Sequence, residues 1–218
     1  NPLAGNGTAQ DKMRELESLM QGDRLYFSNM LDIRDYGAFF NDMPDGASII
    51  ICGGDGTLNR FLNDTEDIRP DCDIYYYPSG SGNDFARDIG AERNAPPVLI
   101  NRYIERLPKI CVNGKEHRFI NGIGYGIDGY CCEKGDELRG KGNGEVNYTA
   151  IAIKGLLFHY KPTGATITVD GVEHRFEKVW LAPTMIGRYY GGGMMPMPEQ
   201  DRLNGDGAVS VTVYYGSG

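Results

Sequence analysis

The sequence lacks an excess of basic residues and any long apolar run. It holds 22 Lys and Arg against 30 Asp and Glu, which gives a formal net charge of −8. Proteins that bind nucleic acids through backbone phosphates have the opposite balance, so we expect no nucleic-acid partner. No stretch reaches the roughly 18 consecutive apolar residues of a membrane-spanning helix, and no leader precedes the first motif. We therefore expect a cytoplasmic protein with neither a transmembrane segment nor a signal peptide.

Metal-binding and disulfide patterns are also missing. The five cysteines have no CxxC spacing, and the three histidines lie outside any HExxH pattern. An odd number of cysteines, two of them adjacent at 131 and 132, favours reduced thiols over a disulfide framework. The sequence therefore predicts neither a zinc site nor an extracellular disulfide scaffold.

The first half of the chain alternates helix and strand patterns. Apolar spacing predicts helices over 9–20, 34–43 and 58–64, and strands over 24–30, 46–52 and 72–78. Strands that alternate with helices and end in glycine turns are typical of a parallel sheet covered by helices. Sites in such sheets lie beyond the carboxyl ends of the strands.

Near residue 108 the pattern becomes mainly antiparallel. It predicts a hairpin within 109–126, a helix over 145–161, and strands within 164–186 and 207–215. We therefore expect an α/β chain of two domains, an N-terminal parallel-sheet domain (1–108) and a second, mainly antiparallel domain (109–218). Further strands are expected beyond both ends, so we expect the second domain to be C-terminally incomplete.

The first chemical motif is the turn "GGDGT", which runs from Gly53 to Thr57 between a strand and a helix. This arrangement gathers backbone N–H groups at a helix N-terminus, where phosphate binds. The glycines are expected to allow close approach and positive φ, and Thr57 to cap the helix or contact phosphate. A carboxylate beside phosphates is repulsive unless a cation or a transferable proton intervenes, so Asp55 favours Mg²⁺ bridging or acid–base chemistry. The alternative is a tight turn with a capping Asp.

A second loop, "PSGSGNDFAR" (78–87), also leads from a strand through glycines into a helix. Ser81 offers a hydroxyl, and Asn83, Asp84 and Arg87 place polar groups at the helix start; alone, Asn83 or Asp84 is equally a helix cap. The sequence has no GxxxxGK[ST] motif, and its two GxG stretches lack the third glycine of a dinucleotide fingerprint. The two loops together predict a phosphate site of another kind.

The segments "NPLAGNG", "GGDGTLNR" and "PSGSGNDFAR", in this order, resemble the diacylglycerol kinase catalytic domain family of lipid kinases. The resemblance continues through "FINGIGYGID" (119–128) and residues 189–213, whereas "GGDGT" alone also matches NAD kinases. It implies an ATP-dependent lipid kinase whose first domain binds the nucleotide and whose second, β-sandwich-like domain serves the lipid substrate. It implies ATP and Mg²⁺ as cofactors. It also implies that the substrate is a lipid such as diacylglycerol, which the protein reaches by binding peripherally to the membrane surface.

Site residues follow from the resemblance by motif. Asp55 and Asp84 would be the catalytic carboxylates that organise Mg²⁺, the phosphates and the substrate hydroxyl. A structural Mg²⁺ would be held by the carbonyls of Leu203 and Ala208 and by the Asp206 side chain. The catalytic base, a glutamate in the family, is expected beyond residue 218. The implied ATP contacts are Asn1, Pro2, Gly5, Gly53, Gly54, Asp55, Gly56, Thr57, Asn59 and Ser81, the last where the family usually has Thr.

Other interpretations stay open at this point. From the residues alone, "NGDG" (204–207) is equally a turn between strands, and 191–193 are either a bulge or a close approach to lipid. The alternative functions are an NAD-kinase-like transferase and a non-catalytic nucleotide-binding module. An open sheet edge could also pair with a second subunit, which would give a homodimer.

Overall fold

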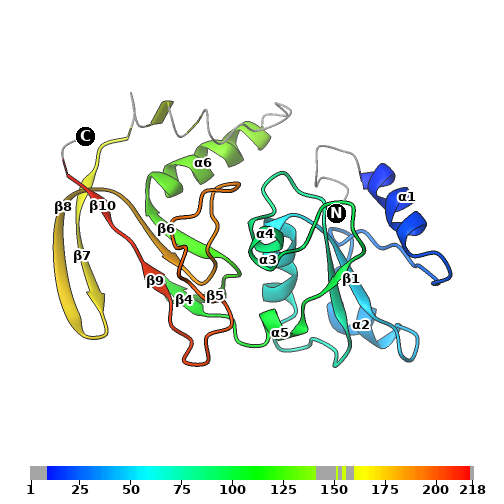
Figure 1. The fold of residues 1–218 in the computed structure, drawn as a ribbon. Helices are drawn as coiled ribbons and strands as arrows, with labels where there is room; N and C mark the ends of the chain where they lie inside the picture. Colours follow the sequence, from blue (N-terminus) through cyan, green and yellow to red (C-terminus); the bar gives the residue numbers. More distant parts are fainter. Residues whose placement is uncertain (1–8, 141–150, 152–153, 156–159, 217–218) are drawn as a thin grey trace. The chain divides into compact units, whose positions relative to one another are not determined.

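A computed structural model describes residues 9–140, 151, 154–155 and 160–216 (Figure 1). The chain divides into two compact units. Unit 1 is Asn1–Asn121 with Ile186–Ala208, and unit 2 is Gly122–Met185 with Val209–Gly218. The coarse prediction of a mixed α/β fold is confirmed. This division rests on compactness alone, so the functional domains 1–108 and 109–218 stay a prediction.

Unit 1 contains five helices and five strands among its described residues. The helices are α1 (Ala9–Leu19), α2 (Tyr36–Asn41), α3 (Asp55–Asp64), α4 (Asp84–Asp88) and α5 (Asn101–Ile104). The strands are β1 (Ile49–Gly53), β2 (Ile74–Pro78), β3 (Val98–Leu99), β4 (Lys109–Val112) and β5 (Lys115–Arg118). The predicted helices over 9–20, 34–43 and 58–64 are confirmed, as are the strands near 46–52 and 72–78.

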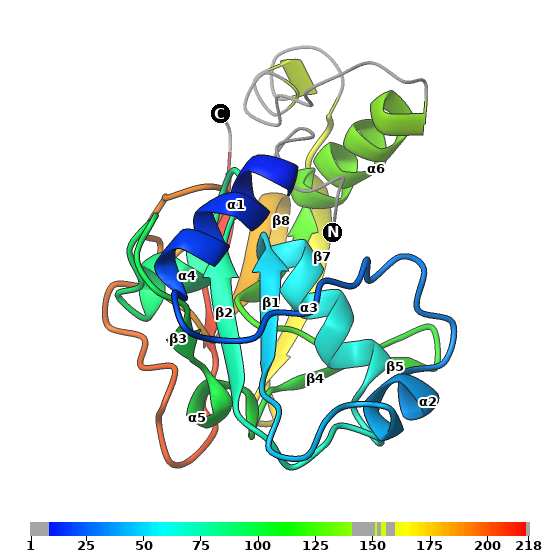
Figure 2. The same cartoon turned by 90° about the vertical axis from the view of Figure 1, so that its right-hand side faces the viewer.

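The main sheet of unit 1 has the strand order β1-β2-β3. Strands β1 and β2 run parallel, with Gly53 opposite Pro78 at their carboxyl ends, whereas β3 pairs with β2 antiparallel. The sheet is thus mixed, not wholly parallel. Helix α1 lies on one face of the sheet and α3 on the other (Figures 1 and 2).

The predicted strand over 24–30 is wrong. These residues form no strand in the structure. A strand is held in place when alternate side chains are buried on one face. Here the consecutive residues Tyr26 and Phe27 are both exposed, at 67% and 41%, so neither face supplies that burial.

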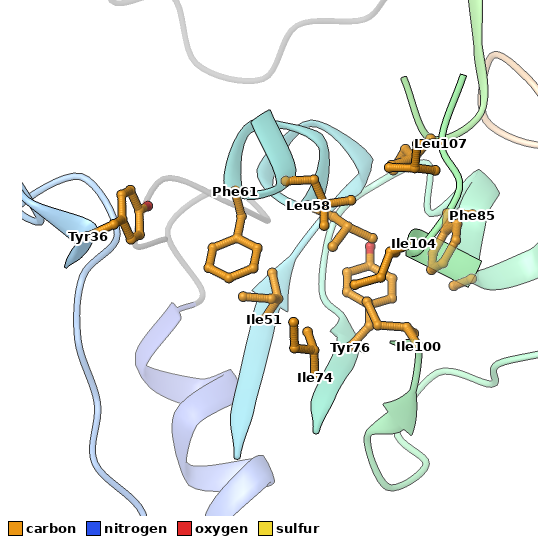
Figure 3. Packing of buried hydrophobic residues seen from close by; sticks show 13 residues of the cluster. Tyr36, Ile51, Leu58, Phe61, Ile74, Tyr76, Phe85, Ile100, Ile104 and Leu107 are labelled. Carbon is orange, nitrogen blue, oxygen red and sulfur yellow. The ribbon is translucent and has the colours of Figure 1, made fainter. Parts of the chain in front are cut away.

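The core of unit 1 fixes α3 behind the two loops that follow β1 and β2. Leu58 and Phe61 of α3 are buried in one cluster with Ile51, Ile74 and Tyr76 from the strands. Figure 3 shows Phe61 and Ile51 facing each other across the gap between helix and strand. The start of α3 is therefore anchored by the apolar face of the helix.

Asparagine side chains join α3 to the β4–β5 hairpin. Asn63 accepts a hydrogen bond from Arg118 N (2.8 Å) and donates one to Arg118 O (3.0 Å). One turn earlier, Asn59 Oδ1 accepts the N–H of Ile120 (3.2 Å). The predicted hairpin turns at Asn113 and Gly114, both with positive φ, and is confirmed.

Unit 2 is built on an antiparallel sheet of five strands, in which the other four strands each pair with β8. The strands are β6 (Gly122–Gly126), β7 (Thr163–Val169), β8 (Val172–Met185), β9 (Ser210–Val211) and β10 (Tyr214–Tyr215), and the described helix is α6 (Ile127–Gly140). The strands predicted within 164–186 are confirmed as β7 and β8, which turn at Asp170 and Gly171, again with positive φ.

Two predictions for unit 2 have other outcomes. The sequence analysis missed α6, whose glycines at 129 and 135 obscure a helical pattern. The predicted helix over 145–161 falls mostly outside the described residues. No helix in the described part of the chain has the length and apolar character needed to cross a membrane.

Candidate functional site

The glycine loops that follow β1 and β2 touch through their backbones. A Cβ added to Gly80 would lie 2.4 Å from Gly54 Cα, and one added to Gly54 would lie 3.1 Å from Gly80 Cα. Ser79 N also donates to Gly53 O (2.9 Å). The close approach to phosphate stays a prediction, whereas the predicted positive φ is wrong for Gly53, Gly54 and Gly56. Gly54 and Gly80 make room between the two loops and do not reverse the chain.

Asn83 closes the second loop on itself. Its side chain accepts the N–H of Gly80 (3.0 Å) and donates to Gly80 O (2.7 Å), while its own backbone is left-handed at φ 53°. The side chain makes no capping bond to α4. The interpretation of Asn83 as a side-chain helix cap is therefore wrong, and its role is to shape the loop.

Asp55 supplies the cap that α4 lacks. Its Oδ2 accepts the N–H of Asp84 (3.0 Å), and its Oδ1 accepts the N–H of Phe85 (2.8 Å) and the side-chain amide of Asn121 (3.1 Å). The alternative of a capping Asp is thus correct in kind, but Asp55 caps the next helix and not its own. Helix α3 begins at Asp55 with Gly54 as its N-cap, so the prediction of Thr57 as the cap is wrong.

Asp84 lies beside Asp55 and is buried. Its Oδ1 accepts from Arg87 Nη1 (2.9 Å) and its Oδ2 from the N–H of Gly192 (2.7 Å). Burial raises the pKa of the Asp84 carboxyl, the Gly192 hydrogen bond lowers it, and the charge of Asp55 raises it. A raised pKa brings a carboxylate closer to the range in which it exchanges protons near neutral pH.

The two carboxylates face one spot. A Cβ on Gly82 would lie 3.5 Å from Asp55 Oδ2, 4.0 Å from Asp84 Oδ2 and 3.7 Å from Gly192 Cα. This places a pair of acidic oxygens beside a residue with no side chain, at the carboxyl ends of β1 and β2. Such a pair can bind a cation or take a proton from a hydroxyl.

The sequence analysis missed the residues that support this pair. Asn121 contacts Asp55 directly, and Arg202 Nη2 donates to Asn121 Oδ1 (2.8 Å). Asp88, one turn after Asp84, accepts from Arg202 Nε (2.8 Å) and from Arg188 Nε (2.8 Å). Asn121 lies within the quoted "FINGIGYGID", but its partners are far away in sequence, and the local pattern carries no sign of them.

The other implied ATP contacts have varied positions. Asn1, Pro2 and Gly5 lie outside the described residues. Gly56 lies in the first turn of α3, and Asn59 is engaged with Ile120 as described above. Ser81 is exposed, and its carbonyl accepts a hydrogen bond from Arg93 Nη2 (3.0 Å).

Hydrogen bonds from side chains close the "LNGDG" loop on its flanking residues. The carbonyl oxygens of Asp201 and Ala208 both lie 2.8 Å from the Asn204 amide nitrogen, and Asp206 Oδ1 accepts the N–H of Ala208 (3.1 Å). Within the described ranges, no group of three or more His, Cys, Asp or Glu side chains could hold a metal. The oxygen donors of this loop are nevertheless of the hard kind that Mg²⁺ prefers.

Unit 2 holds a titratable group and a hollow of its own. Asp128, in the first turn of α6, has its pKa raised by burial to about 6, and its Oδ2 would be only 1.7 Å from a Cβ on Gly124. A hollow of 420 Å³ lies on the sheet. The residues that line it are Tyr125, Gly164, Ala165, Thr166, Ile167, Ala182, Thr184 and Val211.

Comparison with known proteins gives one consistent result. The family model described as "Diacylglycerol kinase catalytic domain" matches residues 1–109. The diacylglycerol kinases of two Mycobacterium tuberculosis strains are 25% identical over 173 residues, which cover 76% of this chain and 54% of each relative. The chain thus spans about half the length of these curated relatives.

The fold agrees with a solved structure. The crystal structure of a diacylglycerol kinase from Bacillus anthracis superposes with a TM-score of 0.61 and 23% identity, over 99% of this chain and 71% of that one. A similarity at this level of identity shows the fold.

We predict that Gly80→Ala destabilises unit 1 and that Gly56→Ala does not. The added methyl at 80 would overlap Gly54 Cα, which we expect to cost about 1–3 kcal/mol of unfolding free energy. At Gly56 no atom lies within 4 Å, and alanine in a helix gains up to about 1 kcal/mol over glycine. Urea unfolding of both variants measures the difference, and equal stability would contradict the backbone contact.

We also predict that Asp128→Asn removes a pH dependence of stability. The folded pKa of about 6 lies above the ordinary 3.8, so the folded state holds this proton more tightly than the unfolded chain. Its stabilisation is complete below about pH 4 and is lost as the pH rises through about 6. Allowing for partial exposure, we expect the wild type to lose about 1 kcal/mol relative to the variant between about pH 4 and about pH 8.

Chemical denaturation at the two pH values measures this change. The matched control is Glu133→Gln, an exposed carboxyl on the same helix, for which we expect no pH-dependent difference from the wild type. The same pH dependence in Asp128→Asn and wild type would show that burial does not hold this proton.

Proposed function

Because this chain belongs to the diacylglycerol kinase catalytic domain family, we propose that it carries the phosphate-transfer site of a lipid kinase. In the proposed reaction, the γ-phosphate of ATP passes to the hydroxyl group of a lipid such as diacylglycerol. The observation that carries this proposal is the convergence of Asp55 and Asp84 beside Gly82, where two glycine loops meet. Phosphoryl transfer to an alcohol needs such carboxylates near a backbone that phosphates can approach.

The two carboxylates differ in a way that suits two roles. Asp55 is held by three hydrogen bonds, two to its Oδ1 and one to its Oδ2, so its orientation is fixed. Asp84 is buried with a raised pKa, which favours it as a group that exchanges a proton. The proposed acceptor hydroxyl is oriented by this pair. Its proton passes to a carboxylate, the glutamate expected beyond residue 218, as the new P–O bond forms and the bond between the γ-phosphate and the leaving ADP breaks.

The nucleotide is proposed to lie on the loops that contact each other at Gly54 and Gly80. Support comes from the start of α3, where Gly54 is the N-cap and no side chain caps the helix. Backbone N–H groups at such a start bind phosphate oxygens. The residues proposed for ATP are Asn1, Pro2, Gly5, Gly53, Gly54, Asp55, Gly56, Thr57, Asn59 and Ser81, within the proposed nucleotide domain 1–108.

Magnesium is proposed at two places. Asp55 and Asp84 would share the ion that accompanies ATP, and Leu203, Asp206 and Ala208 would hold a structural ion. The second site is supported by the Asp206 carboxylate, which lies within hydrogen-bond distance of Ala208 N, so that two of the three proposed ligand residues are adjacent. When bound beside the phosphates, Mg²⁺ would offset the negative charge that develops during transfer.

We propose that the second, β-sandwich-like domain, residues 109–218, binds the lipid substrate. Support comes from the hollow on the unit 2 sheet, because Ile167, Ala182 and Val211 contribute apolar lining that suits a hydrocarbon chain. The family match favours a lipid over NAD as the phosphate acceptor.

We predict that Asp55→Asn lowers phosphate transfer by about 10²–10⁴-fold, because an amide can neither take a proton nor bind a cation as a carboxylate does. The measurement uses the whole protein that carries this chain, γ-labelled ATP and a panel of lipids in mixed micelles. Asp84→Asn is expected to lower transfer as well. Asp45→Asn, an exposed aspartate before β1, is the control that keeps normal turnover.

Thermal melting of each variant separates chemistry from folding, because Asp55 also holds α4. Normal turnover in Asp55→Asn would contradict the proposed role of this carboxylate. Labelled NADP formed from NAD, with no lipid product, would move the chain to the NAD-kinase-like alternative. ATP binding without transfer to either acceptor would support a nucleotide-binding module.

We predict that Mg²⁺ stabilises the protein through the 200–208 loop. At ten times its dissociation constant, a bound ion adds about 1.4 kcal/mol to the free energy of unfolding. Asp206→Ala is expected to lose most of this gain, whereas Glu199→Ala, an exposed carboxylate on the same segment, keeps it. Denaturation with and without Mg²⁺, in the absence of ATP, measures the effect. An equal gain in both variants would rule out Asp206 as a ligand.

A further inference from the structure

Arg202 is a buried cation with a hydrogen-bond partner at each of its three guanidinium nitrogens. Only 9% of the residue is exposed. Its Nε donates to Asp88 Oδ2 (2.8 Å), its Nη1 to the carbonyl of Ile120, and its Nη2 to Asn121 Oδ1 (2.8 Å). The guanidinium carbon lies 4.7 Å from the centre of the Phe85 ring. A planar fork held at each nitrogen has one orientation available to it.

Gly187 provides the space for this guanidinium. A Cβ at this position would lie 2.5 Å from Arg202 Nη2 and 3.1 Å from Asp88 Oδ2. Gly187 N also donates to the backbone oxygen of Asn121 (3.1 Å). The backbone of one segment thus frames both Arg202 and its amide partner.

Arg202 decides which end of the Asn121 side chain faces Asp55. An arginine can only donate, so the amide oxygen of Asn121 must face it. The NH₂ end is then turned to Asp55 Oδ1, at 3.1 Å. Without Arg202, the amide could turn its oxygen to the carboxylate, which is a repulsive contact. The orientation of Asn121 is therefore a consequence of Arg202.

The hydrogen bond from Asn121 occupies one acceptor position of the Asp55 carboxylate, on Oδ1. Asn121 and Phe85 N both donate to Oδ1, while Oδ2 accepts the N–H of Asp84 and lies 3.5 Å from the position that a Cβ on Gly82 would take. A turn of the carboxylate would move this oxygen away from the place where the reacting groups are proposed to meet. The Asn121 donor adds to the two backbone N–H groups that hold the carboxylate against that turn.

Charge is balanced across the same cluster. It contains three carboxylates and three guanidinium groups, namely Asp55, Asp84, Asp88, Arg87, Arg188 and Arg202. A buried charge left without its partner is strongly unfavourable. Arg202 thus supplies a positive charge that pairs with the buried Asp88 carboxylate.

We propose that Arg202, held by Asp88 and acting through the Asn121 amide, is a positioning residue for the Asp55 carboxylate during phosphate transfer. This inference rests on the function proposed above. Arg202 does not touch the reacting atoms in this assignment. It determines how long Asp55 spends in the orientation that the reaction uses, so its loss appears in kcat and not in the affinity for ATP.

The test compares Arg202→Met, Asn121→Ala and the double variant in the whole protein that carries this chain. Steady-state kinetics with ATP and the lipid found for the wild type give kcat and KM for each. We expect each single variant to lose about 10–100-fold in kcat, as for other residues that orient a catalytic group, with KM for ATP within about twofold. Because Arg202 acts through Asn121, the double variant is expected to lose no more than Asn121→Ala alone.

Two further variants separate positioning from structural damage. Arg188→Met is the comparison variant, because Arg188 pairs with the other oxygen of Asp88 at the same distance of 2.8 Å, and its kcat loss is expected to be smaller than that of Arg202→Met, because the Arg202 side chain also donates to Asn121. Gly187→Ala displaces Arg202 Nη2 while the positive charge stays, and it is expected to reproduce the kcat loss. Should Arg202→Met melt below the assay temperature, Gly187→Ala and Asn121→Ala carry the comparison.

The outcomes are distinct. Equal losses of kcat in Arg202→Met and Asn121→Ala that do not add in the double variant support the positioning role of Arg202. An unchanged kcat in Arg202→Met, or losses that multiply in the double variant, would overturn it while the wild-type activity stands. An equal loss in Arg188→Met would show that any damage to the Asp88 ion pair lowers turnover, and would also overturn it. No transfer by the wild type would overturn the proposed function, and this inference with it.

Discussion

The arrangement of the candidate site depends on one interaction, in which the Asp55 carboxylate accepts the first two backbone N–H groups of α4. Helix α4 has only five residues, too few to be stable by its own hydrogen bonds. Its position comes from Asp55, from the Asn83 loop and from the packing of buried Phe85. The carboxylate that the chemistry needs is therefore also the group that places Asp84 next to it. Function and local stability are joined in one side chain.

This interaction requires the two loops to be closer than side chains allow. Parallel pairing of β1 and β2 sets Gly53 opposite Pro78, so both strands end at one edge of the sheet. The contact of Gly54 with Gly80 then brings the loops together at backbone distance. Glycine at these positions is explained by space, since neither residue has a positive φ. A phosphate-binding loop and a close contact between two loops thus both produce glycines directly after a strand, and the sequence alone does not distinguish them.

Sequence reasoning succeeded where signals are local, as the confirmed turn at Asn113–Gly114 and the confirmed helices show. It failed for the strand over 24–30, where apolar residues suggested burial that Tyr26 and Phe27 do not have. It missed Asn121, Arg188 and Arg202 because their partners lie 66 to 114 positions away in sequence. A single sequence does not show which charges will be buried together.

The segment 186–208 shows why those distant partners matter. It belongs to unit 1 although residues 122–185 separate it from the rest of that unit. Its arginines bind both oxygens of Asp88, which is 3% exposed, and its Gly192 N–H binds Asp84. Buried ion pairs add little net stability compared with apolar packing, because both charges lose their water. What such pairs do supply is a defined geometry, since any displacement leaves a charge unpaired. The ion pairs to Asp88 and the hydrogen bond from Gly192 to Asp84 thus fix the position of the segment relative to α4. They thereby fix the position of Asp84 next to Asp55.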